Sequence, residues 1–536
     1  MNTGPASDET NTGGRPVVIV GAGPTGVTAA LLLARHGIPT VVLDRWSGIY
    51  ARPRAVHLDD EVRRILGRIG VDDEFSAISR PALGLRLVDR DLRVLAEFAR
   101  DDVAGVHGYP QANMFDQPAL EGLLRARMHR TPLISFRGNV EVVAVRPVQD
   151  WSGRLAVHFD DLESGNREVI EADHVLGCDG ANSVVREAMA SRMVGLGFEQ
   201  RWLVIDVETD ADIHQWDGVH QVCDRHRAAT FMRIGQQRYR WEFRLLDGEG
   251  LGDFESMSDI HRLIAPWTSG TPLEQLRLIR MADYVFRAQV ADRWRRGGVF
   301  LLGDAAHLTP PFIGQGMGAG LRDANNLAWK LAGVIHRSLG PTALDSYEVE
   351  RKPHARTMIT TAIGIGLAMT GGGAVGEALR GLVFPRAHLV PGLRRVIVES
   401  VSPRLRPSSL LARRRPRRPS ALVGTLAPNA LLGTGGRLDR VADGYILVTR
   451  RAPSPSLEAA LARRRVVTVT ALDDEPLGAW LRRSGAVAAM VRPDFTVAIA
   501  GNDPERMVAH PPGPQQVTDV AASGQPQRRM GASAAG

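Results

Sequence analysis

Residues 16–26 read Pro-Val-Val-Ile-Val-Gly-Ala-Gly-Pro-Thr-Gly, and this stretch decides the fold. A short β-branched run that ends in glycine predicts a buried strand, and the small and apolar residues from 25 to 36 predict a tightly packed helix. Between them, Gly21 permits a tight turn, Gly23 lets a pyrophosphate approach the backbone, and Gly26 lets the helix pack on the strand. The helix N-terminus then faces the phosphates. The sequence therefore predicts a dinucleotide-binding turn rather than a glycine-rich turn without a ligand.

The residues after this helix support the same interpretation. Gly37 suits the end of a helix, and Thr40-Val-Val-Leu-Asp44 predicts a second strand. Two strands joined by a helix indicate a parallel sheet and an α/β fold. Asp44 lies 23 residues after Gly21, where its carboxylate is placed to hydrogen-bond a ribose hydroxyl.

The middle of the chain has a different pattern. The runs 202–207 and 239–246 alternate apolar and polar residues, as in an antiparallel sheet with one exposed face. The run 299–302 again predicts a buried strand, followed by a helix from about 322 to 336, so the second domain interrupts the first. Four strand-like runs between 444 and 500 predict a small α/β domain. The expected segments are a disordered N-terminus (1–15), the dinucleotide-binding domain (16–180), a sheet domain (181–290), the completion of the first domain (291–384), a basic linker (385–420), the small α/β domain (421–510) and a disordered tail (511–536).

Composition limits the classes of protein that remain. With 536 residues, 44% hydrophobic and 23% charged, the chain is neither collagen, a coiled coil nor wholly disordered. Its two cysteines, Cys178 and Cys223, exclude a disulfide framework, a four-cysteine zinc site and a CxxC redox pair. These cysteines, and a polar N-terminus without an apolar signal segment, favour a cytoplasmic location. The stretches 16–34 and 357–376 are uncharged, and we interpret them as the glycine motif and as a buried helix, not as membrane spans.

The net charge is +7, and almost all of the basic charge is arginine, because lysine occurs only at positions 330 and 352. The arginine-rich run 413–418 has no interleaved aromatic residues and lies at a break in composition. We interpret it as a solvated linker rather than a nucleic-acid patch.

Two further motifs carry chemistry. Cys178-Asp179-Gly180 follows an apolar strand end, and Arg186 comes shortly after it. Gly303-Asp304 ends the strand at 299–302, and alternating glycines follow at 314, 316 and 318. Such a loop can bring backbone N–H groups against a flat or anionic ligand. His307 has no cluster of His, Asp or Glu around it in the sequence, so we expect a structural role and no metal site.

Together these three motifs resemble the flavin-dependent aromatic hydroxylases, the group A flavoprotein monooxygenases. Within that family the chain is most similar to the 3-(3-hydroxyphenyl)propionate hydroxylases, from residue 16 to about 355 and weakly through 421–500. The similarity includes the runs Pro53-Arg54-Ala55, Asp59-Asp60-Glu61, Asn113-Met-Phe-Asp-Gln-Pro118, Arg201-Trp-Leu-Val204 and Arg240-Trp-Glu-Phe243. The resemblance implies a Rossmann-like FAD-binding domain interrupted by an antiparallel-sheet substrate domain, plus a degenerate thioredoxin-like C-terminal domain without cysteine.

The resemblance also assigns roles to residues. The ADP half of FAD would be held by Gly21, Gly23, Gly26 and Asp44, with Arg54 near the pyrophosphate. Gln117 would contact the flavin half and Asp304 the ribitol hydroxyls. The isoalloxazine would be lined by Pro311, Gly314, Gly316, Met317 and Gly318. Asp179 would link FAD binding to the approach of the nicotinamide, which Arg186 and Arg287 would contact.

The implied activity uses FAD, O2 and either NADH or NADPH to hydroxylate a phenolic acid such as 3-(3-hydroxyphenyl)propionate, through a flavin C4a-hydroperoxide. The site must exclude water and favour phenolate over phenol. Candidates for the group that activates the phenol are His57 and Asp59, and candidates for binding the substrate are Arg225, Arg233 and Arg244. A hydroxylase of polycyclic or polyketide natural products and a non-catalytic FAD-binding protein remain as alternatives. The expected partners are the phenol and O2, with a homodimer as one option and no nucleic acid or membrane.

Overall fold

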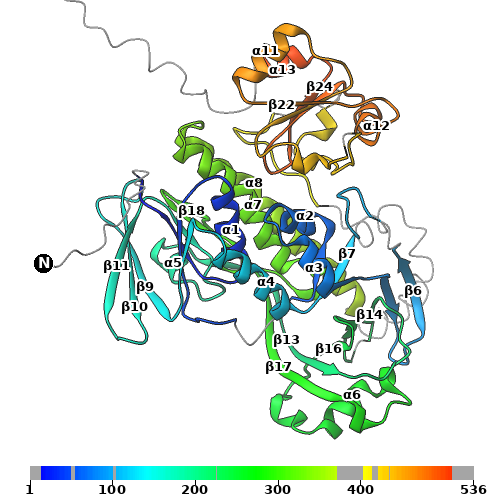
Figure 1. Ribbon diagram of the computed structural model, residues 1–536. Coiled ribbons are helices and arrows are strands. Elements are labelled where there is room, and N and C mark those ends of the chain that lie inside the picture. Colours follow the sequence, from blue (N-terminus) through cyan, green and yellow to red (C-terminus); the bar gives the residue numbers. More distant parts are fainter. Residues whose placement is uncertain are drawn as a thin grey trace, which may run out of the picture.

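The structure is a computed structural model that describes residues 14–49, 55–100, 104–224, 226–370, 402–412, 420–433 and 435–509. Its centre is a six-stranded sheet with the order β18-β19-β12-β1-β2-β8 (Figure 1). The strands are β1 (Val17–Val20), β2 (Thr40–Leu43), β8 (Ile134–Arg137), β12 (Val175–Gly177), β18 (Arg295–Arg296) and β19 (Val299–Leu301). All neighbours except β18 and β19 pair in parallel, which confirms the predicted parallel sheet.

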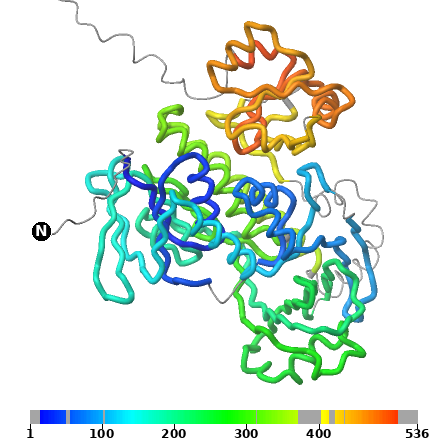
Figure 2. Tube along the Cα trace, viewed as in Figure 1, coloured from blue at the N-terminus to red at the C-terminus, as the bar shows by residue number. Residues whose placement is uncertain are grey.

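Helices from distant parts of the sequence pack together beside this sheet. The four largest are α1 (Pro24–Arg35), α4 (Gln117–His129), α7 (Gly316–Ile335) and α8 (Asp345–Thr370). Helix α1 packs against α4 and α7, so the N-terminal segment and the segment after residue 300 lie side by side (Figure 2). Helix α7 begins at Gly316, six residues before the expected start, because the last glycines of the third motif already belong to it.

An eight-stranded sheet with the order β20-β17-β13-β16-β15-β14-β5-β6 forms the second layer of the molecule. Its strands are β5 (Gly84–Val88), β6 (Val94–Ala99), β13 (Met193–Glu208), β14 (Val219–Val222), β15 (Ala229–Arg233), β16 (Arg238–Arg244), β17 (Arg277–Ala291) and β20 (His307–Leu308). All neighbours pair antiparallel, as expected, except β14 and β5, which pair in parallel.

The two faces of this sheet differ from the expectation in one respect. The apolar face, with Phe231 and Trp241, is covered by α6 (Met257–Thr268), whose Ile264 packs against it. We expected the other face to be exposed, and this was wrong: Arg240 is 1% exposed and Glu242 is 6% exposed. The polar residues of the alternating pattern therefore face an internal space and not solvent.

Smaller elements complete the main body. One three-stranded sheet contains β3 (His57–Asp59), β7 (Ala112–Phe115) and β4 (Ser79–Pro81), and another contains β9 (Val140–Pro147), β10 (Leu155–Asp161) and β11 (Arg167–Ala172). The short helices here are α2 (Asp60–Arg68), α3 (Asp72–Ile78) and α5 (Val184–Ala188).

The C-terminal region forms a separate four-stranded sheet with its own core (Figure 1). The strands are β21 (Ile446–Thr449), β22 (Val467–Thr470), β23 (Ala488–Val491) and β24 (Val497–Gly501), and the helices are α11 (Pro455–Arg463), α12 (Pro476–Arg483) and α13 (Pro504–Ala509). The four predicted strand runs are thus present. The arginine run 413–418, residues 385–401 of the expected linker and the tail from 511 lie outside the described residues.

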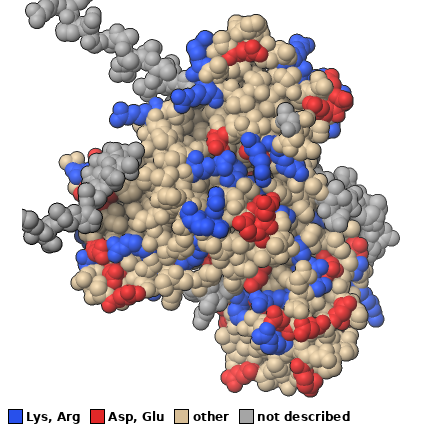
Figure 3. Space-filling model, viewed as in Figure 1, with Lys and Arg blue, Asp and Glu red and all other residues tan. Residues whose placement is uncertain are grey.

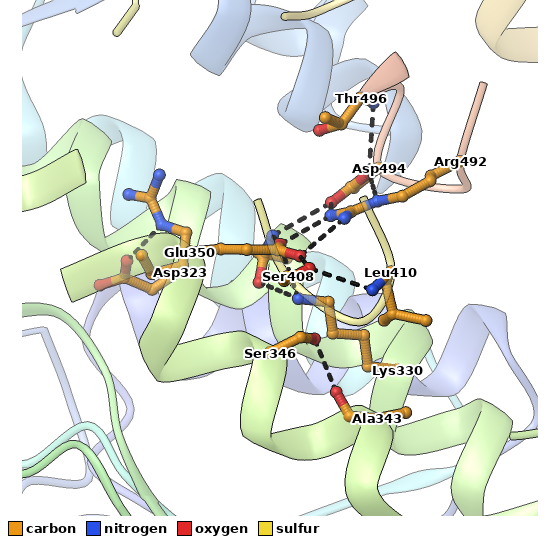
Figure 4. A network of polar contacts seen from close by, with 12 residues as sticks. Asp323, Lys330, Ala343, Ser346, Glu350, Ser408, Leu410, Arg492, Asp494 and Thr496 are labelled. Carbon is orange, nitrogen blue, oxygen red and sulfur yellow. Dashed lines mark hydrogen bonds and ion pairs between the residues drawn. The ribbon is translucent and has the colours of Figure 1, made fainter. Parts of the chain in front are cut away.

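A cluster of buried charges joins this C-terminal region to α7 and α8 (Figure 4). Glu350 accepts hydrogen bonds from Arg492 Nη1 (2.8 Å) and Nη2 (2.9 Å), from Lys330 Nζ (2.8 Å) and from Ser408 Oγ (2.6 Å). Arg492 also donates through Nε to Asp494 (3.0 Å). Burial alone would raise the pKa of Glu350, but the charges of Arg492 and Lys330 outweigh it and hold that pKa well below its usual value.

No helix among the described residues is both long and apolar enough to cross a membrane. No group of three or more His, Cys, Asp or Glu in this part of the chain could hold a metal ion. On the face shown in Figure 3, basic and acidic side chains are interspersed.

Candidate functional site

A cavity of about 1010 Å³ lies between the carboxyl ends of the parallel strands and the polar face of the eight-stranded sheet. The turn after β1, the residues after β12 and the loop after β19 all contribute to its wall, so the three sequence motifs meet at one place. Carboxyl ends of parallel strands are where ligands bind in open α/β sheets. The predicted residues that line the cavity are Gly21, Gly23, Asp44, His57, Gln117, Asp179, Arg287, Asp304, Pro311, Gly314, Gly316 and Met317.

The first motif forms a cradle that side chains would fill. A Cβ on Gly21, whose φ is +101°, would lie 2.3 Å from the Cys178 carbonyl oxygen, and a Cβ on Gly26 would lie 1.9 Å from the Gly21 carbonyl oxygen. Gly23 instead faces open space and precedes α1 without a side-chain cap. The first N–H groups of α1 are therefore directed at a space that suits a pyrophosphate.

Asp44 and Gln117 order the backbone around this cradle. The Asp44 carboxylate accepts hydrogen bonds from the backbone N–H of Ala22 (2.5 Å) and of Trp46 (2.8 Å). The Gln117 amide oxygen accepts a hydrogen bond from the backbone N–H of Ala55 (2.6 Å), and α4 begins at Gln117. Both side chains still line the cavity, where they can meet hydroxyl groups of a ligand.

Hydrogen bonds outside the cavity fix the position of the Asp-Gly motif. Asp179 accepts hydrogen bonds from Ser183 Oγ (2.6 Å) and from the N–H of Val185 (3.1 Å), while burial raises the pKa of its carboxyl. Arg186 donates to the carbonyls of Ala181 (2.7 Å) and Ala305 (3.0 Å). Arg186 is 8% exposed and is not part of the cavity wall, so it ties the second motif to the third rather than reaching into the cavity.

The glycine loop of the third motif lies against His57. A Cβ on Gly314, whose φ is +60°, would lie 3.0 Å from His57 Nδ1. Burial, together with the charge of Arg100, lowers the pKa of His57 to about 4. The imidazole is therefore neutral near pH 7 and lies beside the loop that the resemblance assigns to the isoalloxazine.

Asp59 lies behind the cavity wall. It caps α2 by accepting a hydrogen bond from the N–H of Val62 (3.0 Å), and it accepts others from Arg322 Nη2 (2.5 Å) and Gln315 Nε2 (2.9 Å). Burial opposes ionisation, but Arg322 and these hydrogen bonds hold the pKa of Asp59 below its usual value. Gly318 and Gly26 also lie outside the wall, as packing positions.

The other predicted residues are scattered. Arg287 lines the cavity and pairs with Glu199 (3.0 Å). Arg233 pairs with Asp217 (3.4 Å), Arg244 donates to the carbonyl of His226 (2.9 Å), and neither lines the cavity. Arg54 and Arg225 lie outside the described residues. His307 pairs with Asp323 (2.7 Å) beneath the site, as befits a structural role.

Apart from Arg287, the sequence did not identify the residues on the sheet side of the cavity. Polar residues there are Gln221, Thr230, Glu242 and Arg100, and apolar ones include Met232 and Phe286, with Met114 of β7 packed beside Met232. The alternating pattern of β16 signalled a two-faced strand, but it did not reveal that the polar face meets a cavity.

Comparison with known proteins gives a consistent result. Residues 15–362 match the family model of an FAD binding domain. A probable NADH-specific resorcinol 4-hydroxylase of Rhodococcus jostii is 35% identical over 354 residues, which are 66% of this chain and 65% of that protein. A 3-(3-hydroxy-phenyl)propionate/3-hydroxycinnamic acid hydroxylase of Burkholderia vietnamiensis is 35% identical over 383 residues, which are 72% of this chain and 68% of that one. The chain thus spans about two thirds of the length of these relatives.

Among solved structures, an aklavinone-11 hydroxylase in a ternary complex with FAD and aklavinone superposes with a TM-score of 0.74 at 26% identity. The match covers 91% of this chain and 96% of that one. The likeness therefore extends beyond the dinucleotide-binding part of the molecule.

Proposed function

Since this chain belongs to the FAD-dependent aromatic hydroxylases, a family of flavoprotein monooxygenases, we propose that it uses a reduced nicotinamide and O2 to hydroxylate a small phenol. The observation that carries the proposal is the cavity in which three cofactor motifs meet the polar face of the eight-stranded sheet. One side of it suits a dinucleotide. The other side offers the apolar surface and the few polar groups that orient a ring.

The residues present fit FAD. The cradle at Gly21 and Gly23 suits the pyrophosphate, Asp44 suits a ribose and Asp304 suits the ribitol, while Gly316 and Met317 would lie along the flavin ring. When bound, the flavin supplies the redox chemistry that activates O2. The tasks of the chain are to bind and orient the ring, to exclude water and to handle the proton of the phenol.

His57 is our candidate for the group that accepts the proton of the phenol hydroxyl. Its pKa of about 4 leaves the imidazole neutral and able to accept a hydrogen bond from a phenol hydroxyl. Asp59 would act as a positioning residue through its cap of α2 and its pairing with Arg322. The apolar side chains of Met114 and Phe286 would keep water away from the ring.

The size of the cavity favours a one-ring substrate. Pockets for a single small molecule usually measure roughly 300–1,000 Å³, and here a dinucleotide would share about 1010 Å³ with the substrate. A phenolic acid such as 3-(3-hydroxyphenyl)propionate is one candidate. Arg100, whose pKa burial lowers only to about 10, remains cationic and lines the cavity, so its guanidinium would pair with the carboxylate of such a substrate. The resorcinol 4-hydroxylase relative makes a dihydroxybenzene the second candidate and NADH the first reductant to test.

We also propose that the C-terminal region is a degenerate thioredoxin-like domain. Its element order β-α-β-α-β-β-α and strand order β22-β21-β23-β24 support this interpretation. No cysteine follows Cys223, so thiol chemistry is excluded there. A cytoplasmic location belongs to the same proposal, and the homodimer stays a prediction.

The test is oxidation of NADH and NADPH by the FAD-reconstituted protein, with and without each phenol, with H2O2 and hydroxylated product both quantified. We expect substrate-stimulated oxidation with one product per reduced nicotinamide consumed. Stimulation that yields mainly H2O2 would reject that phenol as the substrate. A yellow, FAD-loaded protein that no one-ring phenol stimulates would reject this substrate class and favour a polycyclic ring, or a non-catalytic FAD-binding protein if no phenol is hydroxylated.

A further inference from the structure

Three polar side chains form a row across the sheet side of the cavity. Gln221 on β14 pairs directly with Thr230 on β15, and Thr230 pairs with Glu242 on β16. Residues that lie directly opposite one another on neighbouring strands point to the same face of a sheet. All three line the cavity, and Gln221 is 3% exposed while Glu242 is 6% exposed. The row is thus a built part of the wall rather than a solvated edge.

The hydrogen bonds within the row leave mainly acceptors for a ligand. The amide nitrogen of Gln221 donates to the carbonyl of Ala229 (3.0 Å), which fixes the orientation of the amide. The amide oxygen then accepts the hydrogen bond that Thr230 Oγ1 donates (3.0 Å). Since the hydroxyl hydrogen of Thr230 is used in this way, its oxygen offers lone pairs to the cavity.

Glu242 adds a carboxyl to the same wall. Among the residues that the structure describes, no group donates a hydrogen bond to this carboxyl, and its ion pair is a long one, to Arg240 Nη1 (3.9 Å). Arg240 is committed elsewhere, because its Nε (2.7 Å) and Nη2 (3.0 Å) both donate to Asp206. Burial raises the pKa of Glu242, as expected for a carboxyl that lacks donors.

These contacts define the ligand group by its chemistry. An acceptor-rich row needs a donor, and a carboxylate, which only accepts, would meet Glu242 as a like partner. An ammonium group would donate, but it would meet the guanidinium of Arg240 immediately behind the carboxyl. A neutral hydroxyl can donate to the row without either conflict.

We propose that Gln221, Thr230 and Glu242 form a subsite for a second hydroxyl group of the aromatic substrate, so that the preferred substrate is a dihydroxybenzene and not a phenolic acid. The inference rests on the proposed function, because it takes the ring bound in this cavity to be the substrate. Glu242 is then the specificity-determining residue that accepts the hydrogen of this hydroxyl.

The experiment uses the full FAD-loaded chain and two probes that differ in one hydrogen-bond donor, resorcinol and 3-methoxyphenol. Dissociation constants come from the change in the flavin absorption spectrum on titration, without turnover, and kcat/KM comes from substrate-stimulated NADH oxidation. Wild-type protein should bind resorcinol about tenfold or more tightly than 3-methoxyphenol, because a site built to bond a hydroxyl rejects the analogue without it. Glu242→Gln should remove most of this preference, because it should weaken the binding of resorcinol and leave the binding of 3-methoxyphenol unchanged.

Two further variants keep the test decisive. Thr230→Val should reduce the preference by a smaller factor and serves if Glu242→Gln does not fold. Glu97→Gln is the matched control, since Glu97 lies on β6 of the same sheet, pairs with Arg86 (2.8 Å) and does not line the cavity; it should leave the preference unchanged. Equal binding of the two probes by wild type, no binding of resorcinol, or equal losses for both probes in Glu242→Gln would each overturn the subsite. Selective binding without hydroxylation would uphold the subsite and overturn the proposed function.

Discussion

Glu350 and Glu242 are both buried glutamates beside an arginine, yet their surroundings are opposite. Glu350 is 0% exposed and accepts hydrogen bonds from Arg492, Lys330, Ser408 and Asn326 (Figure 4). Among the described residues, Glu242 accepts none. The pKa of Glu350 is accordingly held below its usual value, and the pKa of Glu242 is raised above it.

The difference separates a structural charge from a binding one. Buried charges are stable only when they are paired and hydrogen-bonded, and the cluster at Glu350 meets that condition within the chain itself. A carboxyl that lines a cavity and has no donor within the chain satisfies this condition only when a ligand supplies the hydrogen-bond donor. A perturbed titratable group in a cavity is therefore a better indication of function than the many arginine–carboxylate pairs elsewhere in the molecule.

The largest expected effect on stability comes from removing Glu350, the carboxylate whose hydrogen-bond donors lie within the chain. Glu350→Ala leaves Arg492 and Lys330 buried with fewer partners, and removal of one side of a buried pair destabilises by about 3–5 kcal/mol. We expect a loss of this size in the free energy of unfolding, measured by urea denaturation. Asp473→Ala removes the partner of Arg450 in an exposed pair and should give no measurable change. A Glu350→Ala protein as stable as wild type would contradict the structural role of the cluster.

The pH dependence of stability sharpens the same comparison. A carboxyl whose folded pKa is depressed stabilises the protein above its unfolded pKa, about 4.3 for Glu, and the contribution is lost as the pH falls through the folded value. Wild-type stability should therefore fall below about pH 5, and Glu350→Gln should fall less steeply there. Unfolding free energies at a series of pH values between neutral and acid conditions would measure this. Parallel curves for the two proteins would show that Glu350 does not titrate with folding.

Local patterns predicted residues of three motifs that the fold brings to one cavity, but they did not indicate which strand residues form the opposite wall. Gly21, Gly23 and Asp44 lie within one strand–helix–strand unit, so spacing alone places them. The register of β14, β15 and β16 places Glu242 in a row with Thr230 and Gln221, and local sequence does not specify that register. Asp59, a candidate for chemistry by its neighbours in the chain, is instead bound to Arg322, 263 residues away. Partners at such separations are set by packing and not by any periodicity.

The smallest expected effect on stability belongs to Glu242. A carboxyl whose folded pKa is raised contributes stability that is present below its unfolded pKa, about 4.3, and is lost as the pH rises through the folded value. Glu242→Gln removes the cost of burying an ionised carboxylate and keeps the shape of the side chain. At neutral pH the free energy of unfolding of the variant should therefore be within about 1 kcal/mol of wild type. Relative to wild type it should become more stable as the pH is raised from 5 to 8, the opposite of the trend expected when Glu350 is replaced. Urea denaturation of both proteins across that range measures the difference. A variant several kcal/mol less stable at every pH would mean that Glu242 has a partner within the fold, and the contrast with Glu350 would then disappear.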